Sequence, residues 1–441
     1  MTRGKMDPGP NPFCYRDGIL TCEDVAADVI AEAVGTPCYI YAGNEITRNL
    51  KAYQDAFRDL PHLVCYALKA NPSLAILSHL VRRGAGFDAV SGGEIAKALA
   101  AGADPARIVF AGVGKTGEEM HAALVAGIRQ FNVESVPELK ALDDIACSLG
   151  MVAPVALRVN PDVRAQTHRK ITTGMAENKF GIDFANILEV WRMAGEMAHI
   201  RTQGLALHIG SQILSLEPYR AAFNRTAELV SNLRKQGETV ESLDIGGGIG
   251  IAYQHEAGLP PAIADFARLV GETLGDLDCE LIIEPGRSMI GPAGILIATV
   301  LYVKETADRR FLILDAALND LLRPAMYDAW HDLIPFREAD PESRWTPHDV
   351  VGPICESSDT FARDRLLPSL SAGDRVAFLH AGAYGASMAS EYNCRPLVPE
   401  VMVSGDRFSQ IRSRPTIEDM IKRESIPDWL SQDPDDPNEE P

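Results

Sequence analysis

Short β-branched runs alternate with Ala-, Leu- and Glu-rich stretches of helical spacing between residues 63 and 287. Each run ends at a break and is followed by a stretch with helical periodicity, the pattern of a strand followed by a helix. The eight runs span residues 63–68, 87–91, 108–111, 130–133, 155–159, 204–209, 242–245 and 281–283. Eight such units over roughly 250 residues predict a (β/α)8 TIM barrel, and a doubly wound open sheet is the main alternative.

Beyond Pro292 the pattern changes, because strand-like runs follow one another with few helical stretches between them. These runs span residues 295–304, 311–314, 349–354, 375–380 and 399–404, and another at 38–42 precedes the barrel and could join either domain. We therefore expect an α/β chain with a second, mostly antiparallel β domain. The expected parts are an N-terminal segment (1–43) that packs with the β domain, the barrel (44–290), the β domain (291–424) and an acidic, proline-rich tail (425–441) that is disordered.

The chain is acidic, with 42 Lys and Arg against 61 Asp and Glu and a net charge of −19. Such a surface repels phosphate groups, so we expect no nucleic-acid partner and no membrane face. The longest apolar stretch, 294–303, is about half of the roughly 20 residues that a spanning helix needs. The first thirteen residues lack the apolar core of a secretory signal, so we expect a cytoplasmic protein. The eight cysteines have neither CxxC nor histidine ligand spacing, and we expect no disulfide frame and no metal site.

Polar residues gather where the barrel runs end, which is the face that carries active sites in this fold. Lys69 follows the first run. A lone lysine at such a place is ordinarily a solvated side chain. In a cleft, however, it loses hydration, its pKa falls, and it becomes a nucleophile that forms Schiff bases.

Glycines follow the last two runs, at 246–248 and at Gly286. They allow backbone amides to approach an anion, although a tight turn explains them about as well. A dinucleotide site is disfavoured, because residues 253–261 do not continue as a clean helix. His208, which could equally be a core histidine, closes the sixth run; Arg158 closes the fifth and Asp88 lies in the second. A lysine together with a phosphate nest indicates pyridoxal phosphate.

These residues, in this order, resemble the alanine-racemase-like, fold-type III pyridoxal-phosphate enzymes, and more narrowly the diaminopimelate decarboxylases. The resemblance covers about residues 13–420. Its motifs are YALKAN (66–71), FDAVSGGE (87–94), LRVNPD (157–162), KFGI (179–182), HIGSQ (208–212), residues 244–250, EPGR (284–287), NDLLRPAMY (319–327), GPICESSD (352–359) and GAYGASMASEYN (382–393).

The resemblance implies a role for each cofactor-binding residue. Lys69 binds pyridoxal phosphate covalently, His208 stacks on its ring, and Glu284 faces the pyridine nitrogen, where a carboxylate favours the protonated form. Asp88 belongs to the same site. The phosphate-binding set is Gly246, Gly247, Gly248, Gly286 and Arg287, with Ser211 as a hydroxyl donor and Tyr384 closing the pocket.

The resemblance also implies how a substrate with two amino-acid ends is held. Its distal carboxylate meets Arg287, Arg323 and Tyr327, beside Tyr384, because a guanidinium fork suits a carboxylate. Glu356 receives the distal ammonium. Cys355 returns a proton to the carbanion, unless Lys69 does so and Cys355 is a structural thiol. In related enzymes Cys355 and Glu356 come from the neighbouring subunit, which implies a homodimer with shared sites.

The expected reaction is the decarboxylation of meso-2,6-diaminopimelate to L-lysine and CO2, the last step of lysine biosynthesis. The alternatives are a decarboxylase of the same fold for ornithine, arginine, carboxynorspermidine or a carrier-tethered amino acid, and a catalytically inactive binding homologue. A racemase is disfavoured, because GPICESSD and NDLLRPAMY belong to the decarboxylase pattern.

Overall fold

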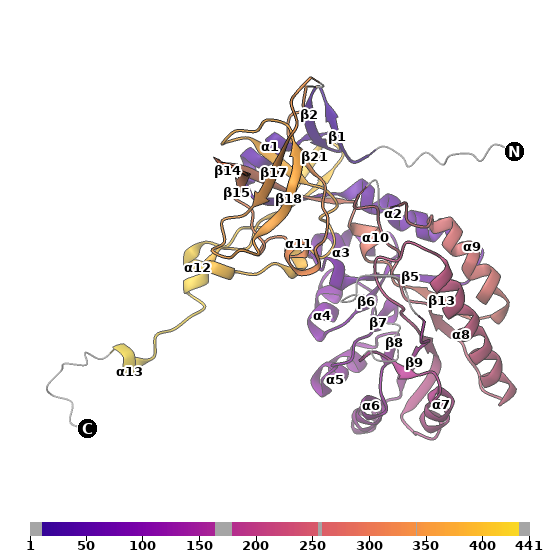
Figure 1. Ribbon diagram of the computed structural model, residues 1–441. Coiled ribbons are helices and arrows are strands. Elements are labelled where there is room, and N and C mark those ends of the chain that lie inside the picture. Colours follow the sequence, from indigo (N-terminus) through magenta and orange to yellow (C-terminus); the bar gives the residue numbers. More distant parts are fainter. Residues whose placement is uncertain (1–10, 164–178, 255–257, 341, 432–441) are drawn as a thin grey trace, which may run out of the picture.

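The chain folds into a closed parallel barrel with a mostly antiparallel β domain stacked on one end of it (Figure 1). A computed structural model describes residues 11–163, 179–254, 258–340 and 342–431. The barrel is confirmed over the open sheet, because two lateral pairings complete the ring: β13 pairs with β5, and β8 pairs with β9. Its strands are β5 (His62–Ala67), β6 (Gly86–Ala89), β7 (Ile108–Phe110), β8 (Gln130–Val133), β9 (Ala153–Asn160), β11 (Ile200–Ala206), β12 (Ser242–Asp244) and β13 (Glu280–Ile283), and β10 (Ile182–Asp183) adds to β9 outside the ring.

The sixth strand differs from its predicted span of 204–209. Strand β11 starts at Ile200 and ends at Ala206, where it pairs with Asp244, the last residue of the short strand β12. The ladder stops there, because β12 ends at Asp244 and glycines 246–248 follow after Ile245. His208 therefore lies in the following loop and not at the end of a strand.

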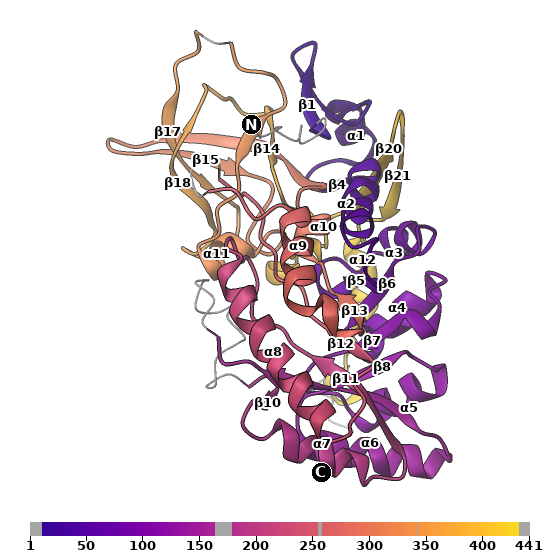
Figure 2. The same cartoon turned by 90° about the vertical axis from the view of Figure 1, so that its right-hand side faces the viewer.

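Helices cover the outside of the barrel, and α8 and α9 lie side by side there (Figure 2). Ser91, Thr116 and Ser135 cap the helices that follow β6, β7 and β8, so each of these helices starts within a few residues of its strand. No helix in the described ranges is long and apolar enough to cross a bilayer. The helices are α2 (Gly43–Ala56), α3 (Leu74–Val81), α4 (Gly92–Ala100), α5 (Gly117–Ala126), α6 (Val136–Leu149), α7 (Ile187–Gly195), α8 (Glu217–Lys235), α9 (Ile263–Leu274) and α10 (Arg287–Ile290).

The β domain is built around the long strand β14 (Gly294–Glu305), which pairs with β15, β19 and β4. Strand β4 (Cys38–Ala42) also pairs with β20, so the chain enters this sheet before it forms the barrel. Strands β16, β18 and β21 were not predicted, because β16 has only three residues and at least half of the residues in β18 and β21 are polar or charged. The other strands are β15 (Arg310–Leu314), β16 (Leu333–Pro335), β17 (Thr346–Val351), β18 (Thr360–Leu367), β19 (Arg375–Phe378), β20 (Glu400–Ser404) and β21 (Arg407–Arg412).

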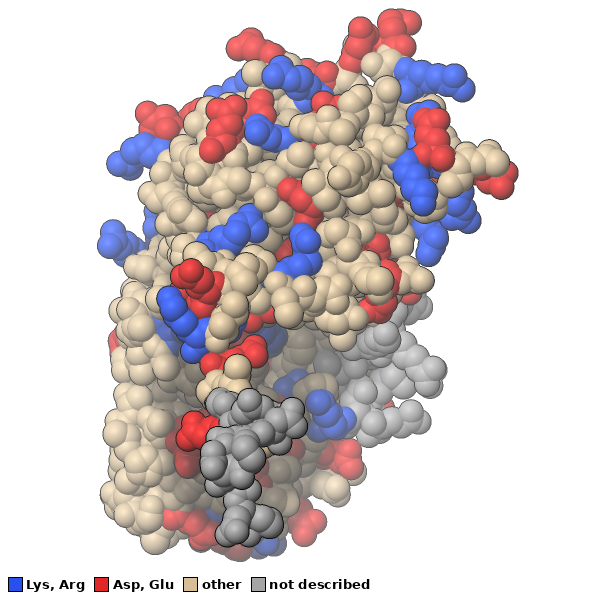
Figure 3. All heavy atoms as spheres, turned by 90° about the vertical axis from the view of Figure 1, so that its left-hand side faces the viewer, with Lys and Arg blue, Asp and Glu red and all other residues tan. Residues whose placement is uncertain are grey.

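The two ends of the chain add short elements to the β-domain side. The N-terminal part contributes β1 (Phe13–Arg16), β2 (Ile19–Cys22), β3 (Val25–Ala26) and α1 (Ala27–Val34), whose apolar residues share a core with the β domain. Helix α11 (Arg323–Tyr327) lies between β15 and β16, and the C-terminal part of the chain forms α12 (Ile417–Ile421) and α13 (Asp428–Ser431). The predicted disordered tail includes α13, and its residues 432–441 lie outside the described residues. On the face in Figure 3, acidic and basic side chains lie interspersed over the β domain.

Polar side chains form a hydrogen-bonded chain through the barrel interior. Gln203 donates to Gln130 (3.1 Å), Gln130 donates to Asn132 (2.8 Å), and Asn132 donates to Asp244 (2.7 Å). All four side chains are buried. The chain ends at the carboxyl edge of the strands, where the sequence predicts the site.

Candidate active site

A cavity of about 670 Å³ opens where the barrel strands end, and residues of the β domain close it from the other side. Asp88 lies behind the wall, bonded to Lys69. Gly246, Gly247, Cys355 and Glu356 are not among the described residues that line the cavity. The predicted site residues that do line it are Lys69, His208, Ser211, Gly248, Glu284, Gly286, Arg287, Arg323, Tyr327 and Tyr384.

Lys69 lies in the 3-10 turn η1 (Leu68–Ala70), directly after β5. Its Nζ donates to Asp88 Oδ2 at 3.0 Å, and Asp88 is fully buried on the neighbouring strand β6. The expectation of a lowered lysine pKa is wrong for this structure. Burial is the largest single influence and opposes the ammonium form, but the charges of Asp88, Glu284 and Tyr384 together outweigh it and raise the pKa of Lys69 above its ordinary value.

Glu284 follows β13 and lies against Asp244, the last residue of β12. Burial, reinforced by the charges of Asp244 and Asp88, raises the pKa of Glu284 well above its usual range. Glu284 Oε1 and Asp88 Oδ1 are buried and have no hydrogen-bond partner among the described residues. Unpartnered buried oxygens are costly, and because Glu284 lines the cavity, its Oε1 indicates that a ligand with a polar or cationic group belongs there.

His208 presents a neutral imidazole to the cavity. Its Nδ1 accepts the backbone N–H of Gly247 at 3.3 Å, which leaves the proton of the neutral ring on Nε2. Burial, with the charges of Lys69 and Arg158, lowers the pKa of His208 well below its usual value. A neutral ring stacks on a cationic pyridine without charge repulsion.

The glycine cluster after β12 does two different things. Gly246 N–H donates to Asp244 Oδ1 (3.0 Å) and Gly247 N–H to His208, so these two amides organise the site from behind. Gly248 lines the cavity at φ +100°, and a Cβ there would lie 2.2 Å from the Gly210 carbonyl oxygen. Of the predicted phosphate-binding residues, the structure brings Gly248, Gly286, Arg287 and Ser211 to the wall of the cavity.

Two arginines lie at the end of the cavity formed by the β domain. Arg287 donates to Tyr253 Oη (2.7 Å) and Ser211 Oγ (3.1 Å). Arg323 contacts His331 Nε2 at 2.7 Å and stacks 4.3 Å from the Tyr253 ring. Neither guanidinium lies within ion-pair distance of a carboxylate of the described residues, so both are available to an anionic substrate group.

Tyr253 and His331 are site residues that the sequence did not indicate. Tyr253 supports both arginines from a loop beyond the glycine cluster, and His331 orients Arg323 from the β domain. No motif or spacing marks either position, because each acts through tertiary contacts. Tyr384 was expected, and it is placed by its own N–H, which donates to the Ala70 carbonyl at 2.8 Å.

Cys355 and Glu356 lie on an exposed loop between β17 and β18, outside this cavity. The Cys355 N–H donates to Asn393 Oδ1 at 3.3 Å, and Glu356 accepts from Tyr392 Oη at 3.0 Å. Within one chain these two residues and Lys69 do not meet.

The cavity fits pyridoxal phosphate. It combines an amine, a neutral imidazole, an unpartnered carboxyl oxygen and a wall of glycines with a serine hydroxyl. Lys69, Glu284, His208, Gly248, Gly286 and Ser211 are the residues that would hold this cofactor.

Comparisons with known proteins agree with this geometry. Residues 43–291 match the family described as pyridoxal-dependent decarboxylase, pyridoxal binding domain. The chain is 47% identical over 414 residues to a diaminopimelate decarboxylase of Pseudomonas aeruginosa, covering 94% of this chain and 99% of the relative. It is 45% identical to that of Zymomonas mobilis, covering 95% of this chain and 100% of the relative. A crystal structure of diaminopimelate decarboxylase from Helicobacter pylori complexed with L-lysine superposes with a TM-score of 0.86 at 43% identity, covering 90% and 98% of the two chains. The chain belongs to the diaminopimelate decarboxylase family of pyridoxal-dependent decarboxylases.

Proposed function

We propose that this protein decarboxylates meso-2,6-diaminopimelate to L-lysine and CO2 with pyridoxal phosphate as cofactor. The observation that carries the proposal is the pair Arg287 and Arg323 in the same cavity as Lys69 and Glu284. One end of the cavity binds a cofactor and the other offers two guanidiniums to a second carboxylate. Family membership supports this choice of substrate, because the similar relatives carry the same name.

When bound, pyridoxal phosphate supplies an aldehyde that condenses with amines and a ring that accepts the electron pair left by CO2. The protein supplies the surroundings. Asp88 holds Lys69 at the end of β5, His208 offers a flat neutral face, and Gly248 and Ser211 offer donors for an anion.

Arg323, Arg287 and Tyr327 hold the distal carboxylate of the substrate, and Glu356 takes the distal ammonium. Fixing the distal end aims the other carbon at the cofactor, so substrates that lack it lose turnover as well as affinity. Cys355, or alternatively Lys69, returns the proton to the carbon that lost CO2.

The working unit in this proposal is a homodimer with shared active sites. It is supported by the exposure of Cys355 and Glu356 away from the cavity of their own chain. Mixing Lys69→Ala chains with Cys355→Ala/Glu356→Ala chains tests it, because each hybrid dimer then has one complete site. We expect up to about a quarter of wild-type activity to return after subunit exchange. A mixture as inactive as its components contradicts shared sites.

We propose a cytoplasmic location. All eight cysteines are unpaired in the structure, as is common where thiols are kept reduced.

A substrate comparison tests the function directly. Holoenzyme is incubated separately with meso-diaminopimelate, ornithine, arginine and lysine, and released CO2 is measured. Release from diaminopimelate alone supports the proposal. Release only from ornithine or arginine favours the alternative substrates, and release from none of the four, without a cofactor absorbance band, indicates an inactive homologue.

A further inference from the structure

The carboxyl group expected at the pyridine nitrogen has a second carboxyl group behind it. Asp244 and Glu284 come from adjacent parallel strands, 1% and 7% exposed, and their side chains share a hydrogen bond. Two carboxyl groups can share a hydrogen bond only if a proton lies between them.

The contacts of Asp244 indicate which residue holds that proton. Asp244 Oδ1 accepts the N–H of Gly246 (3.0 Å), and Oδ2 accepts Asn132 Nδ2 (2.7 Å). The Asn132 amide is oriented by Gln130 Nε2, which donates to Asn132 Oδ1 at 2.8 Å. A carboxyl group with an N–H donor on each oxygen is held in its ionised form, so the proton belongs to Glu284.

The other charged groups around Glu284 do not change this assignment. Lys69 is paired with Asp88 at 3.0 Å, so these two charges offset each other. Burial and the charge of Asp244 raise the pKa of Glu284 well above its usual range, and burial raises the pKa of Asp244 to about 6. The pair then carries one negative charge, located mainly on Asp244.

We propose that the pyridine nitrogen faces a proton-sharing pair, in which Glu284 accepts its hydrogen bond through Oε1 while Asp244 carries the negative charge. Glu284 lines the cavity, its buried Oε1 has no hydrogen-bond partner among the described residues, and its carboxyl group is hydrogen-bonded to Asp244. Asp244 is thus a positioning residue that acts through Glu284. The inference rests on the proposed function only for the presence of the cofactor, not for the identity of the substrate.

The substitution Glu284→Gln distinguishes this proposal from a site in which the Glu284 carboxylate alone keeps the ring nitrogen protonated. Gln Oε1 can accept at the cavity while its amide donates to Asp244, which imitates a protonated glutamate. Holoenzyme is loaded with pyridoxal phosphate labelled with ¹⁵N in the ring, and NMR reports whether that nitrogen is protonated. We expect Glu284→Gln to keep the protonated ¹⁵N shift, and Glu284→Gln/Asp244→Asn to move it to the unprotonated value. If Glu284→Gln alone moves it as far as the double variant, the proposal is wrong.

A second measurement covers the case in which the double variant loses its cofactor. Infrared difference spectra of the holoenzyme should contain a protonated-carboxyl band that is absent from both Glu284→Gln and Asp244→Asn. A band that persists in Asp244→Asn overturns the proposal. Asp320→Asn is the matched control, because Asp320 is an equally buried carboxyl group in the β-domain part of the chain. The ring ¹⁵N shift of the cofactor in this variant should equal that in the wild type. Neither readout needs substrate, so failure here is distinct from failure to release CO2.

Discussion

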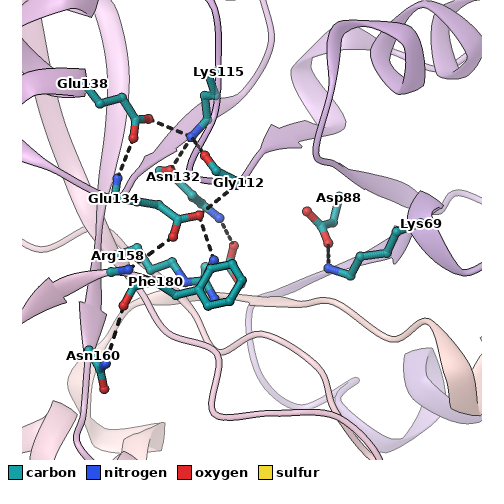
Figure 4. A network of polar contacts seen from close by, with 12 residues as sticks. Lys69, Asp88, Gly112, Lys115, Asn132, Glu134, Glu138, Arg158, Asn160 and Phe180 are labelled. Atoms are coloured by element: carbon teal, nitrogen blue, oxygen red, sulfur yellow. Dashed lines mark hydrogen bonds and ion pairs between the residues drawn. The ribbon is translucent and has the colours of Figure 1, made fainter. Parts of the chain in front are cut away.

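Two groups of charged residues lie close together in the barrel and differ in how completely their charges are matched (Figure 4). In the first, the balanced cluster, Lys115 pairs with Glu138 at 2.7 Å and Arg158 pairs with Glu134 at 2.8 Å. Lys115 also donates to the Gly112 and Asn132 carbonyls (2.7 and 2.9 Å). Each cation here has an anion.

The second group, the cavity cluster, consists of Lys69, Asp88, Asp244 and Glu284. It has one cation for three carboxyl groups, and Asp88 Oδ1 and Glu284 Oε1 have no partner among the described residues. The balanced cluster joins the loops after neighbouring strands, whereas the cavity cluster leaves negative charge for a ligand to neutralise. The comparison teaches that incomplete matching, rather than burial of charge itself, marks the place where a cationic group binds.

The largest effect on activity should come from the lysine of the cavity cluster. We expect Lys69→Ala to lower kcat by at least about 10³-fold, because no other lysine lies among the described residues that line the cavity. Borohydride reduction should fix the cofactor to the wild-type peptide containing position 69 and not to the variant. Covalent labelling elsewhere in the wild type contradicts the assignment.

The lysine of the balanced cluster should instead affect stability. Lys115→Met leaves the largely buried Glu138 carboxylate without its cation, and we expect the free energy of unfolding to fall by about 3–5 kcal/mol. Urea denaturation of holoenzyme measures this. Lys51→Met is the matched control, because Lys51 pairs with Asp55 on the surface, and it should cost less than about 0.5 kcal/mol. Equal losses of unfolding free energy in Lys115→Met and Lys51→Met would contradict a structural role for the balanced cluster.

Arg323→Lys tests the two arginines, Arg287 and Arg323, that lie without a paired carboxylate of the described residues at the far end of the cavity. A lysine keeps the charge but loses the planar fork, so we expect kcat/KM for diaminopimelate to fall by about 10- to 100-fold. The cofactor absorbance band should be unchanged, which separates substrate binding from cofactor binding. An unchanged kcat/KM assigns the distal carboxylate to another residue.

Glu284→Gln should have the smallest effect of the four. We expect it to retain the cofactor and to slow decarboxylation by about tenfold, equivalent to about 1.4 kcal/mol in the barrier. The reason is that the glutamine amide keeps the hydrogen bonds to the ring and to Asp244, but its N–H cannot move to Asp244 as a shared carboxylic proton can. Single-turnover CO2 release measures the rate, and an unchanged rate would refute a role for the shared proton.

The sequence by itself determined the architecture and most of the site. Alternating strand and helix periodicity predicted strands covered by helices, and the strand ends then place Lys69, Glu284 and Gly286 on one face. The choice of the barrel over the open sheet came from the β13–β5 and β8–β9 pairings. The motifs added Arg323 and Tyr384 from a distant part of the chain. Each of these residues lies at a predicted strand end or in a short sequence motif, and both can be recognised without the tertiary structure.

Only the tertiary structure decided the charge states and the supporting contacts. Lys69 has a raised pKa because folding brings Asp88 from the next strand to within 3.0 Å of it. Gly247 turns its amide toward His208, and Tyr253 reaches Arg287 across the loops. These properties depend on distances between residues far apart in sequence, and electrostatic interactions change steeply with such distances, so no local pattern could encode them.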